Sequence, residues 1–158
     1  MIKIRLVCVG NLKEKFLVEG VGEYAKRLQK FCSFEVVEVS EAKSFSKLND
    51  SEINTIKEIE GEAILSKLKG YVVALCIQGK QFSSEDFSQE IQDLVNSGVG
   101  EITFVIGGSY GLSDKVIQKS NLKLSFSKFT FPHQLMRLIF VEQIYRAFNI
   151  ASHSAYHK

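Results

Sequence analysis

The sequence predicts an α/β domain in which a mostly parallel sheet carries helices on both faces. Two observations support this prediction. Short runs rich in Val, Ile and Leu recur along the chain with little polar alternation, as expected of strands covered on both faces. Segments with apolar residues at helical spacing separate these runs, and such alternation is typical of a parallel sheet. The chain has 158 residues, so we expect residues 1–158 to form a single domain.

The strands and helices are assigned from these patterns and from their boundary residues. The predicted strands are residues 3–9, 34–39, 71–77, 102–106 and 122–126. Helices are predicted over residues 12–31 and 52–68, where apolar residues recur at helical spacing, and a short one over residues 113–119. Another helix is expected to begin at Ser83, because acidic residues follow it, and to end before Gly98.

The last predicted helix begins at Pro132, the only proline of the chain, which is expected at the first helical position. The residues after it, as far as Phe148, are apolar nearly all round the helix. Such a helix needs cover on more than one side. In a domain of this size the sheet covers one side, and a second subunit is the natural candidate for the other.

Charge is unevenly distributed along the chain. Residues 1–30 hold seven Lys or Arg against three Glu, residues 31–114 hold six Lys against fourteen acids, and residues 115–158 hold seven against one. The net charges are therefore +4, −8 and +6, although the whole chain is only +2. Basic ends of this kind favour a polyanionic partner, with an unevenly charged solvated surface as the alternative.

The sequence also narrows the location of the protein. The N-terminal apolar run is interrupted by charges and is too short for a signal peptide. No stretch approaches the roughly 20 apolar residues of a membrane span. The three cysteines are far apart and form no Cys/His cluster, so no zinc site is expected. We therefore expect a soluble protein in the cytoplasm, without a membrane or metal partner.

Three loops are expected at the carboxyl ends of strands, where ligands bind in parallel sheets. They are residues 78–80, 107–111 and 127–131. The first lacks the spacing of a phosphate-binding loop, because Ala74 stands at the required glycine and Gln81 at the Ser/Thr. The spacing of the second does not fit a dinucleotide-binding fingerprint, and a plain tight turn is an equal alternative for it. Together the three loops favour a small-molecule pocket.

All three histidines lie in the last 26 residues, within a basic segment. A neutral imidazole can accept a proton near pH 7. His133 follows Pro132 and can simply cap or pack the start of the helix, and His153 can be a solvated loop residue. His157, beside Tyr156 and Lys158, is the most suggestive of the three.

Five ordered sequence blocks resemble the RlmH family of ribosomal RNA large-subunit methyltransferases, members of the SPOUT superfamily. The resemblance covers the whole chain and includes Val9-Gly10 after the first strand. The blocks are LCIQGK at 75–80, VIGGSYGL at 105–112, PHQLMR at 132–137, EQIYRAF at 142–148 and YHK at 156–158.

The resemblance implies a fold and an activity. It implies a C-terminal trefoil knot of the SPOUT type, which periodicity does not indicate. It implies a homodimer that uses S-adenosyl-L-methionine to methylate N3 of a pseudouridine in helix 69 of 23S rRNA, on the assembled ribosome. The implied cofactor-binding residues are Leu75, Gly107, Phe126, Ser127, Lys128, Phe129, Thr130 and Phe131.

The resemblance also suggests catalytic residues near the C-terminus. Our hypothesis makes His157 the base or proton relay, Tyr156 the group that orients the flipped base, and Arg146 the ligand of a phosphate or uracil carbonyl. Ala155 stands where many family members have proline, which leaves the placement of this tail open. The alternative function is a non-catalytic RNA-binding dimer that keeps the knotted fold.

Overall fold

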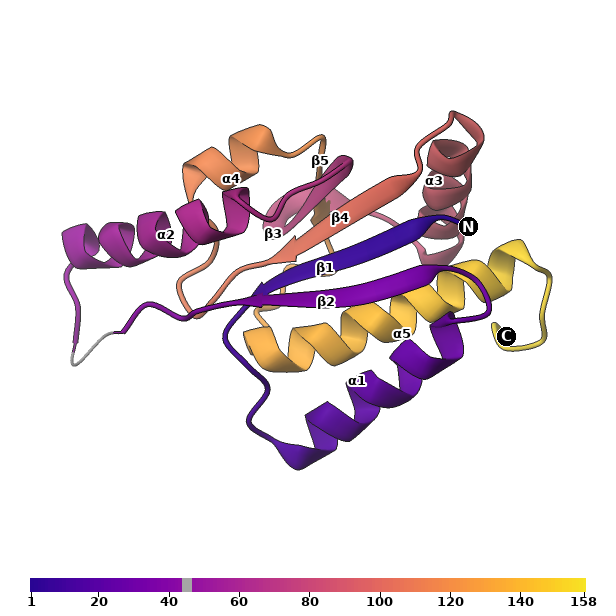
Figure 1. The fold of residues 1–158 in the computed structure, drawn as a ribbon, viewed down its shortest axis with the longest axis horizontal. Helices are drawn as coiled ribbons and strands as arrows, with labels where there is room; N and C mark the ends of the chain where they lie inside the picture. Colours follow the sequence, from indigo (N-terminus) through magenta and orange to yellow (C-terminus); the bar gives the residue numbers. More distant parts are fainter. Residues whose placement is uncertain (44–46) are drawn as a thin grey trace.

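A computed structural model describes residues 1–43 and 47–158 and contains five strands and five helices in strict alternation (Figure 1). The strands form one parallel sheet in the order β2-β1-β4-β3-β5. The elements are β1 (Lys3–Val9), α1 (Lys15–Leu28), β2 (Ser33–Val39), α2 (Asp50–Leu65), β3 (Tyr71–Gln81), α3 (Ser84–Asn96), β4 (Glu101–Ile106), α4 (Asp114–Lys119), β5 (Leu122–Ser125) and α5 (His133–Ala151). The predicted α/β architecture is confirmed.

Helices cover both faces of the sheet. Alternate residues of β1 point to opposite faces, so Leu6 joins a core shared with α1, α3 and α5, whereas Val7 joins a core shared with α2 and α4. Both side chains are fully buried. Figure 1 shows α1 and α5 side by side on one face and α2 with α4 on the other. The carboxyl ends of β3, β4 and β5 are therefore neighbours at one edge of the domain.

The third strand differs from its predicted form. It pairs with β5 as far as Leu75 opposite Leu124, and the pairing resumes at Lys80, again opposite Leu124. Residues 76–79 bulge out of the ladder between these two points. The prediction that residues 78–80 form a loop after the strand is therefore wrong, because Lys80 has returned to the sheet. A Cβ atom on Gly79 would lie 2.7 Å from backbone atoms of Leu124, so only glycine fits.

The last helix packs against the sheet between α1 and α3. Pro132 is its N-cap residue, with ψ of 133°, and the first helical residue is His133. The prediction of proline at the first helical position is therefore wrong by one residue, because the extended ψ places Pro132 outside the helix. Apolar side chains of α5 such as Leu135 and Ile139 remain half-buried. Cover from a second subunit and the trefoil knot both stay predictions.

Candidate functional site: a strand-end cavity and a C-terminal polar cluster

A cavity of about 1030 Å³ lies at the carboxyl ends of β3, β4 and β5. The bulge of β3, the glycine loop after β4 and the segment between β5 and α5 form most of its wall. Pockets that enclose small molecules commonly measure about 300–1000 Å³. The three predicted segments meet here because the sheet places their strands side by side.

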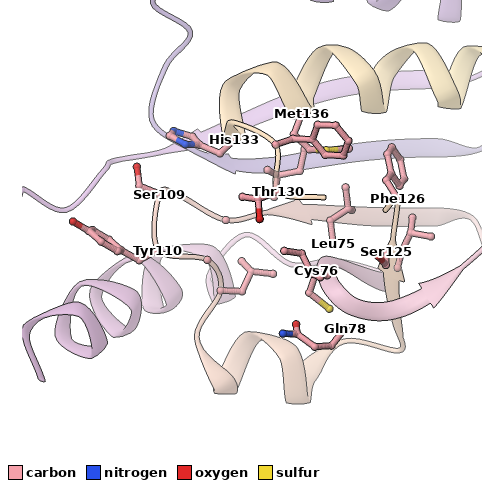
Figure 2. A pocket seen from close by; sticks show the side chains of 18 of the residues that line it. Leu75, Cys76, Gln78, Ser109, Tyr110, Ser125, Phe126, Thr130, His133 and Met136 are labelled. Carbon is pink, nitrogen blue, oxygen red and sulfur yellow. The ribbon is translucent and has the colours of Figure 1, made fainter. Parts of the chain in front are cut away.

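Seven of the eight predicted cofactor-binding residues line this cavity; Lys128 is the exception. In Figure 2, Leu75 and Thr130 lie between the aromatic rings of Phe126 and Tyr110. Phe129 belongs to the same wall and leaves 78% of its area exposed. The seven residues are Leu75, Gly107, Phe126, Ser127, Phe129, Thr130 and Phe131.

The cavity wall also contains residues that the sequence reasoning did not place there. Cys76 and Gln78 reach it because the strand bulges, and Figure 2 shows both side chains at one side of the cavity. Lys57 reaches it from α2, Asp114 from α4 and Met136 from α5. Gly79 offered a signal, because a glycine next to a strand can mark a bulge or a close approach of backbone.

His133 also lines the cavity, at the start of α5. Its Nε2 atom is buried without a hydrogen-bond partner among the described residues. Burial lowers the pKa of His133, with Glu41 acting in the opposite direction. The imidazole is therefore neutral at pH 7 and faces the cavity as well as packing the helix start.

The three predicted catalytic residues come together in a second place, between α5 and the C-terminal tail. Nη2 of Arg146 donates to Oε1 of Glu142 over 2.6 Å, and the hydroxyl of Tyr156 donates to the same oxygen over 3.0 Å. The guanidinium of Arg146 lies 4.9 Å from the centre of the Tyr156 ring. Burial and the Glu142 carboxylate raise the pKa of Tyr156, so its hydroxyl stays protonated.

His157 joins this cluster through both ring nitrogens. Nδ1 lies 3.1 Å from Nη1 of Arg146, and Nε2 lies 2.7 Å from Oε1 of Glu85. A guanidinium can only donate, so Nδ1 must accept and Nε2 must carry the proton toward Glu85. The hydrogen bond from His157 lowers the pKa of Glu85. In this arrangement the lone pair that a general base needs faces Arg146.

The cluster and the cavity are separate within one protomer. None of Arg146, Tyr156 and His157 lines the cavity. A smaller cavity of about 250 Å³ shares Phe126 and Phe131 with the large one, and its wall includes Gln143, the neighbour of Glu142 in the sequence. The structure therefore brings the predicted residues into two groups rather than one site.

Comparison with known proteins identifies the family. A family described as "Predicted SPOUT methyltransferase" matches residues 2–157. The chain belongs to the SPOUT methyltransferase family. "Ribosomal RNA large subunit methyltransferase H" of Latilactobacillus sakei subsp. sakei (strain 23K) is 54% identical over 159 residues, covering 99% of this chain and 100% of that protein.

Solved structures support the SPOUT fold at low sequence identity. A probable methyltransferase from Bordetella pertussis Tohama I aligns with a TM-score of 0.54 at 12% identity, covering 91% of this chain and 93% of that one. Lpg2936 from Legionella pneumophila, solved in complex with the cofactor SAM, aligns with a TM-score of 0.50 at 12% identity, covering 93% and 66%.

Two further findings concern the residues that the structure describes. Within residues 1–43 and 47–158, no group of three or more His, Cys, Asp or Glu side chains is placed to hold a metal ion. None of the described helices is both long enough and apolar enough to span a bilayer.

Proposed function

We propose that this SPOUT family member transfers a methyl group from S-adenosyl-L-methionine to N3 of a pseudouridine in helix 69 of 23S rRNA, on the assembled ribosome in the cytoplasm. The observation that carries the proposal is the strand-end cavity of about 1030 Å³, which is lined by seven residues expected to bind the cofactor. The 54% identical relative, a ribosomal RNA large subunit methyltransferase, supports the substrate class.

The cavity fits the cofactor in size and in lining. Its volume of about 1030 Å³ accommodates a nucleoside with an amino-acid side arm. Leu75, Ile106 and Phe126 supply apolar walls, and the Gly107–Gly108 backbone approaches without side chains. We propose that Leu75, Gly107 and the segment 126–131, including Lys128, hold the cofactor. Bound S-adenosyl-L-methionine supplies a sulfonium methyl group for an in-line displacement.

We also propose that two chains associate so that the polar cluster of one protomer lies beside the cavity of the other. Within one protomer the cluster lies outside the cavity wall, so a composite site brings the two groups together. Leu135 and Ile139 on α5 and the exposed rings of Phe129 and Phe131 offer apolar surface for this association.

In the composite site, Arg146, Tyr156 and His157 act on the target nucleotide. His157 takes the proton from N3, a role that typically accelerates a reaction by about 10²–10⁴-fold. For this its Nδ1 must first be released from Arg146, since the guanidinium now occupies the lone pair. Arg146 turning to a phosphate or uracil carbonyl of the substrate provides that release. Tyr156, protonated, orients the flipped base by stacking.

The test combines cofactor binding with methyl transfer. Calorimetry measures the affinity for S-adenosyl-L-methionine, and tritium transfer to ribosomes from a strain lacking the enzyme measures activity in a single turnover. H157A is expected to bind the cofactor normally and to lose methyl transfer by about 10²-fold or more. H153A is the matched control, because His153 lies in the same tail and is exposed.

Full single-turnover activity in H157A would overturn the assignment of the base. A wild-type protein that binds rRNA without binding S-adenosyl-L-methionine would support the alternative, a non-catalytic RNA-binding dimer. Complementation in a mixed dimer tests the composite site, because an H157A chain paired with a chain defective in the cofactor cavity retains one complete site.

A further inference from the structure

A buried carboxyl group lies directly behind the glycine loop of the cavity. Glu60, on α2, is 3% exposed. Its Oε2 atom accepts a hydrogen bond from the backbone N–H of Ala42 over 3.0 Å. Its Oε1 atom is buried and has no hydrogen-bond partner among the described residues. Glu60 itself does not line the cavity, so it acts on the site only through its neighbours.

Glu60 contacts the cavity wall through Gly108. A Cβ atom on Gly108 would lie 2.9 Å from Oε1 of Glu60 and 3.2 Å from a methyl group of Val9. The carboxyl group is therefore packed against the α-carbon of Gly108, whose other side faces the cavity. Gly108 anchors the loop, because its carbonyl accepts from the N–H of Gly111 over 3.1 Å. Glu60 thus joins α2, the segment after β2 and the cavity loop.

This arrangement is costly for the free protein. A buried polar atom without a partner loses its hydration and gains no hydrogen bond in return. Burial raises the pKa of Glu60; the Ala42 N–H opposes this shift and the nearby Glu41 carboxylate adds to it. An apolar side chain at this position would remove the cost of the buried oxygen. If Glu60 served stability alone, an apolar residue would serve better, so its unpartnered buried oxygen calls for another explanation.

We infer that Glu60 is a positioning residue for the cofactor loop, holding Gly108 and hence residues 107–111 against the cavity. The inference rests on the proposed function, since it assigns the loop to S-adenosyl-L-methionine. Without the carboxyl group the loop can retreat into the space behind it, and the cofactor must then spend binding energy on ordering the loop.

Three variants on the same helix test this role by calorimetry with S-adenosyl-L-methionine and by thermal melting. E60A is expected to weaken cofactor binding about tenfold, equivalent to about 1.4 kcal/mol, with no loss of melting temperature. E60Q keeps the size of the side chain and an acceptor for Ala42, so it is expected to bind within about twofold of wild type. E58A is the matched control, because Glu58 is exposed on α2.

Two results would overturn the inference. One is an E60A affinity within twofold of wild type. The other is an equal fall in affinity and melting temperature in E60A and E60Q, which would indicate a general folding role. The pair can also be tested directly, because G108A should impair binding less in the E60A background than in wild type, where the new methyl group meets the carboxyl group.

A further readout separates this inference from the proposed function. Hydrogen exchange at the amide of Gly111, which bonds to Gly108, reports loop order in the absence of cofactor. E60A should accelerate this exchange and E60Q should not. If the wild-type protein fails to bind S-adenosyl-L-methionine, the proposed function is wrong, but the exchange rate of Gly111 still tests the role of Glu60. An unchanged exchange rate in E60A would contradict that role.

Discussion

Replacement of Arg137 by methionine is expected to destabilise the protein strongly. Arg137 on α5 is 1% exposed, and its Nη2 atom donates to the carbonyls of Val9 and Gly10 over 2.8 and 2.6 Å. Its Nη1 atom donates to Oε2 of Glu38 over 2.7 Å. These bonds tie the segments after β1 and at the end of β2 to the first turns of α5. Methionine keeps much of the volume and removes all three donors.

The expected loss of stability depends on the groups that R137M leaves without a hydrogen-bond partner. The side chain of Glu38 is 42% exposed and regains water, so its loss costs little. The two carbonyls lose charged donors, each typically worth about 1.5–3 kcal/mol. Removing the buried guanidinium recovers part of this, so we expect a net loss of about 3 kcal/mol. In a domain of this size that corresponds to a fall in melting temperature of roughly 6–12 °C.

Differential scanning calorimetry of wild type, R137M and R27M measures this effect. Arg27 is a suitable control, because its ion pair with Glu23 lies on the surface of α1, where solvent screens the attraction. A melting temperature for R137M within 3 °C of wild type would refute the reasoning, since it would mean that the carbonyls of Val9 and Gly10 do not depend on Arg137.

Three further predictions concern the cavity and its surroundings. G79A should force β3 and β5 apart at Leu124. We expect it to lower the free energy of unfolding by about 1–3 kcal/mol in denaturant titrations, and to lower the cofactor affinity as well. An unchanged free energy of unfolding would contradict the bulge. Burial raises the pKa of Glu60 in the folded state above its ordinary value of 4.5, so protonated Glu60 stabilises the fold below pH 4.5 and this stabilisation is lost as pH rises through the folded-state pKa. The stability gain of E60Q over wild type should therefore grow with pH. A gain that shrinks with pH would contradict this prediction. K128Q should weaken the binding of S-adenosyl-L-methionine measured by calorimetry, and an unchanged affinity would contradict the assignment of exposed Lys128 to the cofactor.

The sequence predicted the order of the elements and most of the cavity, because both depend on local patterns. Apolar runs and helical spacing define the strands and helices, and a parallel sheet gathers strand ends at one edge. The bulge of β3 could not be predicted in this way, because it depends on where β5 resumes pairing. Leu75 and Lys80 both lie opposite Leu124, which is a relation between strands more than 40 residues apart.

The polar residues with structural roles were also beyond the sequence argument. Glu60 looks like an ordinary helix residue, although its spacing of four from both Ile56 and Ile64 places it on the buried face. The basic C-terminal segment is less available to RNA than its charge of +6 indicates. Arg137 is buried in a structural pair and Arg146 is engaged by Glu142, both arrangements that only the folded chain reveals.

The central claim is that this SPOUT family member methylates a pseudouridine of the large ribosomal subunit. Mass mapping of 23S rRNA from the wild-type strain, from a strain lacking the gene and from that strain with the gene restored tests it most directly. The account predicts one methyl group on N3 of a helix 69 pseudouridine that disappears with the gene and returns with the wild-type copy. An rRNA whose helix 69 carries the same mass in all three strains would contradict it.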